Sequence, residues 1–193
     1  KSFENGCVFI VGGSGGIGSL CAEEFAQLGA RVVITYYKNE QAAIDIADDI
    51  NKDVQIYQLD NSDPKSVEET FQKVVNDHGS INTLINAAGF DIPQKFISEI
   101  DIDLWKGVID ADINGFFNLV KFGLPHLRKS QGSIVFISSA GLFKYPPGDI
   151  LSVAPKATIE HLLKGIAKEE GKNGVRANSI ALGVIDTGIF HRL

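Results

Sequence analysis

Methionine is absent from the 193 residues of this chain, and cysteine occurs only twice. Cys7 and Cys21 lie in an expected strand and an expected helix, and neither has a second cysteine at CxxC spacing. The pattern of a disulfide framework or of a cysteine-rich zinc site is therefore missing. We expect two reduced, structural thiols in a cytoplasmic protein that has no metal site.

Long apolar runs and an excess of positive charge are also missing. No apolar stretch approaches the roughly 20 residues that a membrane-spanning helix needs, and the opening KSFENG leads directly into the first expected strand without a signal-peptide pattern. The formal net charge of -6 argues against nucleic acid or an anionic membrane as the main partner. A hydrophobic content of 44% suits a core of ordinary size, so we expect one domain over residues 1–193.

Strand and helix patterns alternate along nearly the whole chain. Short apolar runs that suit buried parallel strands fall at 7–11, 31–36, 54–59, 81–86, 133–138 and 175–180. Helical patterns fall between them at 17–29, 39–51, 63–79, about 101–129 and after Ser152. Asp63 is the expected N-cap of the third helix, with Pro64 at its first position. The alternation predicts an α/β fold with a three-layer, doubly wound parallel sheet.

A glycine-rich turn, IVGGSGGIG at 10–18, joins the first strand to the first helix. It fits G-x-G-x-x-G on Gly13, Gly15 and Gly18, and G-x-x-x-G-x-G on Gly12, Gly16 and Gly18. Glycine lets the backbone approach a ligand closely, and the helix N-terminus offers free N–H groups to a phosphate. The alternative is a tight turn without a ligand, but the position between a strand and a helix favours nucleotide binding.

Five further motifs follow in order: LD at 59–60, NAAG at 86–89, ISS at 137–139, Lys156 and GVIDT at 183–187. Together with the glycine spacing, they resemble the classical short-chain dehydrogenase/reductase family over essentially the whole chain. The resemblance implies a Rossmann-type fold that binds NAD(H) or NADP(H) at the carboxyl ends of the strands. It also implies a homodimer or homotetramer that acts on a small-molecule carbonyl or alcohol, as a 3-oxoacyl or ketone reductase does.

By this resemblance, Asp60 would meet the adenine ring, Asn86 and Gly89 would line the ribose side, and Ile185 and Thr187 would hold the nicotinamide carboxamide. Taken alone, Asp60 also fits a helix cap or a solvated loop acid, and NAAG also fits a turn of small residues. The residues expected to bind the dinucleotide are Gly12, Ser14, Gly16, Ile17, Gly18, Tyr36, Tyr37, Lys38, Asp60, Asn61, Asn86, Ala88, Gly89, Lys156, Gly183, Ile185 and Thr187.

The end of the second strand bears on the choice of dinucleotide. A carboxylate there binds the ribose 2′-hydroxyl of NAD and repels the 2′-phosphate of NADP. This sequence reads ITYYKN, with Tyr36 where the family's acid usually stands and Lys38 two residues later. A missing acid and a nearby cation favour NADP(H), with NAD as the alternative, although Lys38 also fits a solvated surface charge.

The catalytic group departs from the family pattern. In the family, a tyrosine four residues before the lysine exchanges the substrate proton, and an upstream serine and asparagine assist. Here Lys156 is in place, but Ser152 stands in the tyrosine position and Asp112 in the asparagine position. The serine that holds the substrate oxygen is expected at Ser139 from its distance to position 152, or at Ser138 from its distance to the glycine at 141.

Ser152 has two interpretations. It fits an N-cap of the helix that follows, with Pro155 in the first turn, and it also fits a proton donor, although a serine hydroxyl is a far weaker acid than a phenol. Tyr145 is the nearest phenol in sequence, but Pro146 and Pro147 mark it as a loop anchor. The sequence therefore predicts a hydride-transferring oxidoreductase, or alternatively a non-catalytic dinucleotide-binding homologue that acts as a sensor or an oligomer partner.

The family normally continues beyond the GVIDT region through a substrate-covering segment and a final strand. It also carries a proline before the glycine at 183, where this chain has Leu182. Together with the missing methionines, the end at Leu193 leads us to expect a domain without the usual C-terminal segment, and residues of the natural protein that this chain lacks.

Overall fold

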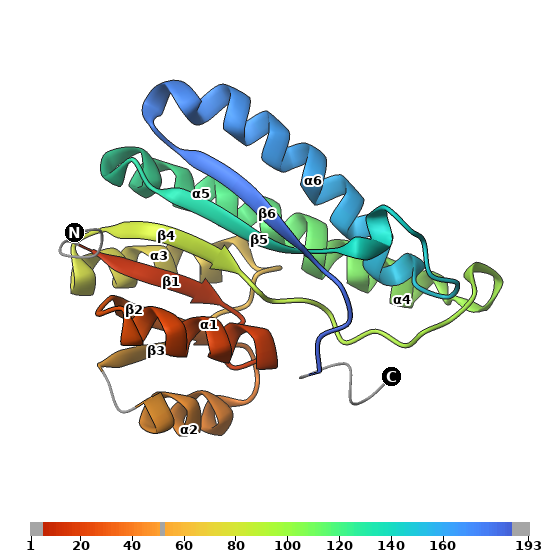
Figure 1. Ribbon diagram of the computed structural model, residues 1–193, viewed down its shortest axis with the longest axis horizontal. Helices are drawn as coiled ribbons and strands as arrows, with labels where there is room; N and C mark the ends of the chain where they lie inside the picture. The colour runs from red at the N-terminus through yellow and green to blue at the C-terminus, as the bar shows by residue number, and fades with distance from the viewer. Residues whose placement is uncertain (1–5, 51–52, 187–193) are drawn as a thin grey trace.

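The computed structural model describes residues 6–50 and 53–186. Six parallel strands form one sheet in the order β3-β2-β1-β4-β5-β6, with helices on both faces (Figure 1). The strands are β1 (Cys7–Val11), β2 (Arg31–Tyr36), β3 (Val54–Gln58), β4 (Ile81–Asn86), β5 (Ser133–Ser139) and β6 (Arg176–Leu182). The α-helices are α1 (Gly16–Gln27), α2 (Glu40–Ile50), α3 (Pro64–His78), α4 (Ile102–Val108), α5 (Gly115–Ser130) and α6 (Ile150–Glu170). This confirms the predicted doubly wound parallel sheet and its Rossmann-type order.

The described part of the chain also contains four shorter helical segments. Three of them are 3-10 turns, namely η1 (Ile97–Glu99), η3 (Ala140–Leu142) and η4 (Gly171–Asn173). The fourth, η2 (Ile109–Asn114), is a π-helical segment between α4 and α5. None of the helices in these described ranges is long and apolar enough to cross a membrane.

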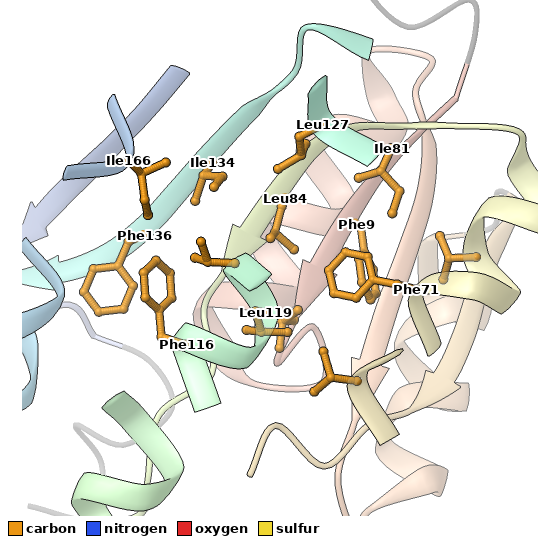
Figure 2. Packing of buried hydrophobic residues seen from close by; sticks show 14 of the residues in the cluster. Phe9, Phe71, Ile81, Leu84, Phe116, Leu119, Leu127, Ile134, Phe136 and Ile166 are labelled. Carbon is orange, nitrogen blue, oxygen red and sulfur yellow. The ribbon is translucent and has the colours of Figure 1, made fainter. Parts of the chain in front are cut away.

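Alternating side chains of the strands build one hydrophobic core on each face of the sheet. Phe9 of β1 points to the face covered by α3, α5 and α6, where it packs edge-to-face on Phe71 with ring centroids 5.2 Å apart (Figure 2). Its neighbours Val8 and Ile10 point to the other face and pack with α1 and α2 residues such as Ala22 and Ala43. Because the central strands β1 and β2 are apolar and buried on both faces, the middle of the sheet lies inside the domain, and its carboxyl edge is free to carry a site.

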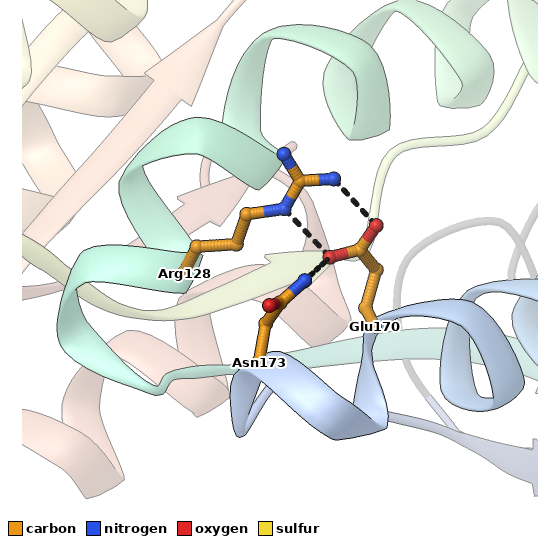
Figure 3. A network of polar contacts seen from close by, with 3 residues as sticks. All are labelled: Arg128, Glu170 and Asn173. Atoms are coloured by element: carbon orange, nitrogen blue, oxygen red, sulfur yellow. Dashed lines mark hydrogen bonds and ion pairs between the residues drawn. The ribbon is translucent and has the colours of Figure 1, made fainter.

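The ends of α5 and α6 are joined by a polar network that lies away from that edge. The Arg128 guanidinium donates two hydrogen bonds of 2.6 Å to the Glu170 carboxylate, and Asn173 Nδ2 donates a third at 2.8 Å (Figure 3). Glu170 is only 6% exposed, so its charge depends on these partners. The network fixes the C-terminal end of α6 against α5, and thereby the direction of the helix that carries Lys156.

Several local predictions are confirmed by the structure. Asp63 caps α3 by accepting a hydrogen bond from the Lys65 N–H, with Pro64 at the first helical position and Gly79 as the C-cap. The chain leaves α1 through Gly29, which has a φ of 82° that suits glycine. Cys7 and Cys21 are free thiols, and burial raises the pKa of Cys7 to about 12, which suppresses its reactivity.

Two local predictions are wrong. The helical region expected at about 101–129 is interrupted by the π-helical turn η2, which the apolar periodicity does not reveal. The last long helix begins at Ile150 rather than after Ser152, so Ser152 lies inside the helix and is not its N-cap. The earlier start follows from the loop before it, where Gly148 adopts a φ of 83° and the Asp149 carbonyl accepts the N–H groups of Ser152 and Val153. Pro155 accordingly lies beyond the first turn of α6.

Candidate functional site

The glycine-rich loop lies where the strand order of the sheet reverses. β1 pairs with β2 on one side and with β4 on the other, and the chain continues after β1 and after β4 to helices on opposite faces of the sheet. In open parallel sheets this crevice is the usual place of a ligand. The Gly12 N–H donates to Thr35 Oγ1 of β2 at 3.1 Å, and a Cβ on Gly12 would lie 2.6 Å from the backbone nitrogen of Ala88. The loop after β1 and the NAAG loop after β4 are therefore packed directly against each other.

The glycines of this loop have different roles. A Cβ on Gly18 would overlap the carbonyl oxygen of Gly12, and one on Gly13 would overlap Ile34, so these positions are closed by the protein itself. Gly15 is the N-cap of α1, and no side-chain cap is found at this helix start within the described residues. The first N–H groups of α1, beginning at Gly16, therefore remain available to an anion. This cradle fits the pyrophosphate of a dinucleotide.

The loops after β3 and β4 are held by local hydrogen bonds. Asp60 Oδ1 accepts from both the backbone N–H and the hydroxyl of Ser62, which orients the carboxylate. The backbone carbonyl of Asn61 accepts from Asn118 Nδ2 of α5 at 2.9 Å. Asn86 is buried and accepts the Ala88 N–H on its side chain. The structure thus brings Asp60, Asn86 and Ala88 to the carboxyl edge of the sheet.

The end of β2 presents both signs of charge. The Lys38 ammonium lies 4.9 Å from the centroid of the exposed Tyr37 ring. The buried Tyr36 donates its phenol hydrogen to Glu40 Oε1 at 2.8 Å. A carboxylate therefore stands beside the strand end even though position 36 is not acidic. The sequence analysis identified Lys38 but missed Glu40, which the spacing of a strand-end tyrosine and the first residue of the next helix could have indicated.

A cavity of about 120 Å³ lies beside the NAAG loop at the start of α6. It combines residues from three separate parts of the chain: the loop after β4, the π-helical turn and the first two turns of α6. Its lining residues are Gly89, Phe90, Ile92, Gln94, Asp112, Asp149, Ser152 and Lys156. Three of the four expected catalytic residues, Asp112, Ser152 and Lys156, are thereby brought together.

Lys156 is the cation of this cavity. Its ammonium donates a hydrogen bond of 3.3 Å to Ser152 Oγ, one turn earlier on the same face of α6. No carboxylate lies within ion-pair distance of Lys156 in the described part of the chain. An ammonium has three donors, so Lys156 keeps donors for a ligand hydroxyl after it has bonded to Ser152.

Two carboxyl groups from different elements line the same cavity. Asp112 belongs to the π-helical turn, and its Oδ1 accepts the Phe90 N–H at 3.1 Å. Burial raises the pKa of Asp112, and the attraction of Lys156 opposes this shift only in part. Asp149 is the N-cap of α6 but makes no side-chain capping bond, and burial also raises its pKa against the attraction of Lys156. π-Helical turns are frequent at functional sites.

The two candidate serines at the end of β5 do not line this cavity. Ser139 Oγ accepts the Gly141 N–H at 3.0 Å, which caps η3. Ser138 is 3% exposed, and its hydroxyl has no hydrogen-bond partner within the described residues. Ser138 lies on the same face of β5 as Ile134 and Phe136, and this face packs against α5 and α6. Of the two hydroxyls, the one at Ser138 is therefore uncommitted on the side of the sheet where α6 lies.

Among the described residues, the remaining ones predicted to belong to the site do not line the cavity of Lys156. Tyr145 is 48% exposed in the loop between η3 and α6 and does not line the cavity. After β6, Ile185 is 40% exposed, and a side chain at Gly183 would meet no atom within 4 Å. Thr187 lies outside the described residues. Sequence reasoning missed Asp149, because nothing in its immediate neighbourhood distinguishes it from a loop acid before a helix.

Comparison with known proteins agrees with this arrangement. A family model described as short chain dehydrogenase matches residues 6–193. Meso-2,3-butanediol dehydrogenase of Serratia marcescens is 32% identical over 189 residues, which cover 97% of this chain and 74% of the relative. The oxidoreductase YxbG of Bacillus subtilis is 33% identical over 193 residues, which cover 98% of this chain and 70% of the relative.

Solved structures agree as well. A short chain dehydrogenase from Burkholderia cenocepacia in complex with NADP superposes with a TM-score of 0.90 at 25% identity. The match covers 98% of this chain and 78% of that chain. The chain thus spans roughly three quarters of the length of the proteins that it matches.

Proposed function

Because the chain belongs to the short-chain dehydrogenase family, we propose that it is an oxidoreductase that transfers a hydride between NADP(H) and the carbon of a carbonyl or alcohol group. One structural observation supports this most directly. Ala88 packs against Gly12 of the glycine loop, while the next residue, Gly89, lines the cavity of Lys156. A dinucleotide whose pyrophosphate lies on the glycine loop would therefore reach toward that cavity.

One group of site residues would bind the dinucleotide, and a second group would contact the substrate or move its proton. The start of α1 would hold the pyrophosphate, Asp60 and Asn86 the adenine and ribose regions, and Lys156 the hydroxyls of the nicotinamide ribose. When bound, the nicotinamide supplies or accepts the hydride. Ser138 or Ser139 would donate a hydrogen bond to the substrate oxygen. Asp112, whose pKa is raised, would relay a proton near Lys156.

NADP(H) is the proposed dinucleotide, with NAD(H) as the alternative. Lys38 supports NADP(H) because its exposed ammonium can neutralise a 2′-phosphate, and a relative of the same family was solved with NADP. Glu40 favours the alternative, since a carboxylate near the ribose repels that phosphate. The exposure of Lys38 leaves it free to turn toward a ligand, whereas the Tyr36 hydroxyl ties Glu40 in place, so we assign the preference to NADP(H).

Thermal unfolding with added dinucleotide tests this assignment. NADPH should raise the unfolding midpoint more than NADH at equal concentration, because a ligand of the folded state stabilises it by mass action. Lys38→Glu should reverse the preference, whereas Lys73→Glu, an equal charge change on the exposed side of α3, should leave it unchanged. Equal shifts by both dinucleotides in all three proteins would contradict the NADP(H) assignment.

A second function, dinucleotide binding without turnover, is supported by Ser152. The residue in the position of the family's phenol is a hydroxyl of much weaker acidity, and it is hydrogen-bonded to Lys156. A protein of this kind would act as a sensor or an oligomer partner. It would bind NADPH as above but transfer no hydride to any substrate. A cytoplasmic location and a homodimeric or homotetrameric assembly remain part of the proposal for either function.

A further inference from the structure

The cavity beside Lys156 carries more negative than positive charge. Asp112 and Asp149 contribute two carboxyl groups, and Lys156 is the one cationic side chain among the residues that line it. No ion pair joins Lys156 to either acid within residues 6–50 and 53–186, and no hydrogen-bond donor reaches the Asp149 carboxylate there. When both acids are ionised, the cavity therefore has a net charge of about -1 that the protein itself leaves uncompensated.

The same cavity lacks the phenol that would protonate an alkoxide in the family pattern. Ser152 takes the phenol position, and Tyr145, the nearest phenol in sequence, does not line the cavity. A ketone that accepts a hydride becomes an alkoxide, which must then take a proton from a sufficiently acidic group. A substrate whose reduction needs no proton would be matched to this set of side chains.

We infer that the cavity takes a substrate whose reacting group is a cationic carbon–nitrogen double bond, an iminium, with the corresponding amine as the reduced form. This inference rests on the proposed dinucleotide site. It differs from the proposed function in the substrate, whose reacting group is a charged carbon–nitrogen double bond in place of a neutral carbonyl. Asp149, the N-cap of α6, and Asp112, of the π-helical turn, line the cavity and would both lie near the positive nitrogen. Lys156 is held away from it by its bond to Ser152 and by the ribose hydroxyls that it would bind.

The chemistry balances without an acid. The iminium carbon receives the two electrons and the hydrogen of the hydride, the carbon–nitrogen π bond becomes the nitrogen lone pair, and the product is a neutral amine. The positive charge of the substrate passes to the oxidised nicotinamide, and no proton moves in this step. The two carboxylates stabilise the cationic substrate during binding. A serine in the phenol position is then no obstacle, because no group has to protonate the product.

The cavity also helps to set the size of the reacting group. A volume of about 120 Å³ admits a small ring or a short chain around the nitrogen, with the rest of the molecule outside. The five-membered rings 1-methyl-1-pyrrolinium and cyclopentanone form a matched pair for this site. They have similar shapes, and only the first carries a permanent charge at the reacting group.

Binding is measured first, with the protein free of dinucleotide and with two saturated rings, pyrrolidinium and cyclopentanol. Ligand-observed NMR titration should show tighter binding of pyrrolidinium. Asp149→Asn should weaken that binding roughly three- to thirtyfold without unfolding the protein, because Asp149 makes no capping bond to lose. Asp110→Asn removes an equal charge from the same π-helical turn but outside the cavity, and it should have no effect.

Turnover with NADPH is measured second. We expect 1-methyl-1-pyrrolinium to be reduced and cyclopentanone not, with a loss of kcat/KM for the iminium in Asp149→Asn and in Asp112→Asn. The amide oxygen introduced by Asp112→Asn would still accept the Phe90 N–H, so this variant changes the charge and keeps the contact. Equal reduction of the ketone, or an unchanged kcat/KM in both variants, would overturn the inference. Failure of NADPH itself to bind would overturn the proposed function and this inference with it, whereas binding of NADPH without binding of pyrrolidinium would overturn the inference alone.

Discussion

The Lys156 ammonium nitrogen lies 3.3 Å from the Ser152 hydroxyl oxygen, one turn apart on the same face of α6. The pair occupies the wall of a cavity that also contains Asp112 and Asp149. Ser152 can hold Lys156 in place, but it cannot supply a proton as readily as a phenol would. In the proposed function the two residues therefore affect different steps. Lys156 would support dinucleotide binding, whereas Ser152 would be a poor donor of a proton to an alkoxide.

Lys156→Ala should weaken NADPH binding roughly ten- to a hundredfold, because a hydrogen bond from a charged group is worth about 1.5–3 kcal/mol. The effect is expected whether or not the protein turns over a substrate. Calorimetric titration of NADPH measures it, with Lys164→Ala on the exposed side of α6 as the control. An unchanged dissociation constant in Lys156→Ala would mean that this lysine does not bind the ribose.

Ser152→Tyr should create or raise NADPH-dependent reduction of small ketones, since it places a phenol one helical turn from an ammonium that lowers its pKa. Ser152→Phe fills the same space without the hydroxyl and should show no gain. Absorbance of NADPH during turnover of a ketone panel measures both variants. Equal activity of the tyrosine and phenylalanine variants would show that the phenol is not the missing element.

The two serines at the end of β5 should respond differently to alanine. Ser139→Ala removes the acceptor of the Gly141 N–H and should cost about 1 kcal/mol of stability, as the loss of a cap does. Ser138→Ala removes a buried hydroxyl that has no partner within the described residues and should leave stability unchanged or slightly raised. Denaturant unfolding measures the stability. A fall of kcat in Ser138→Ala alone would assign the substrate hydrogen bond to Ser138, and a fall in Ser139→Ala alone would assign it to Ser139.

The stability of the fold should depend on pH through Glu170. The Arg128 guanidinium, with help from Asn173, lowers the pKa of the Glu170 carboxyl from 4.5 to about 2. A carboxyl with a depressed folded-state pKa stabilises the folded state above its unfolded-state pKa, and this contribution is lost as the pH falls from about 4.5 to about 2.

Glu170→Gln should accordingly lower the thermal unfolding midpoint by roughly 3–10 °C at neutral pH and flatten the decline of stability in that acid window. Glu169→Gln, its exposed neighbour, should change neither. Calorimetric scans at a series of pH values measure both variants. A stability that declines as steeply with acid in Glu170→Gln as in the unsubstituted protein would contradict the assigned role of the network.

Local sequence rules predicted the parts of this fold that depend on neighbours in the chain. The Asp63–Pro64 helix start and the glycine turn after β1 need no knowledge of the rest of the molecule, and both are confirmed. The start of α6 was placed too late at Ser152, because a serine before an apolar pattern is a good N-cap. Gly148, just before the helix start, has a positive φ, and its carbonyl accepts the Lys95 N–H from a distant part of the chain, a contact that local sequence rules do not include.

The candidate site could be predicted only in part for the same reason. The lysine, the serine four residues before it and the aspartate of the π-helical turn follow from motif positions. Asp149 is recognised as a site residue only from the folded structure, in which it shares a cavity with the loop after β4 and with the turn η2. The π-helical turn itself keeps the apolar pattern of an ordinary helix, so periodicity gives no sign of it.

Deuteride transfer from NADPH that is deuterated at both C4 positions would show directly whether the site transfers a hydride. The protein is incubated with this dinucleotide and with a panel that includes 1-methyl-1-pyrrolinium and small ketones. Mass spectrometry then measures the deuterium content of the products. We expect one deuterium at the former double-bond carbon of at least one product, and much less labelled product from Lys156→Ala at limiting dinucleotide. If no member of the panel gains deuterium while NADPH saturates the protein, the site does not transfer a hydride to these substrates, and the protein binds the dinucleotide without turnover.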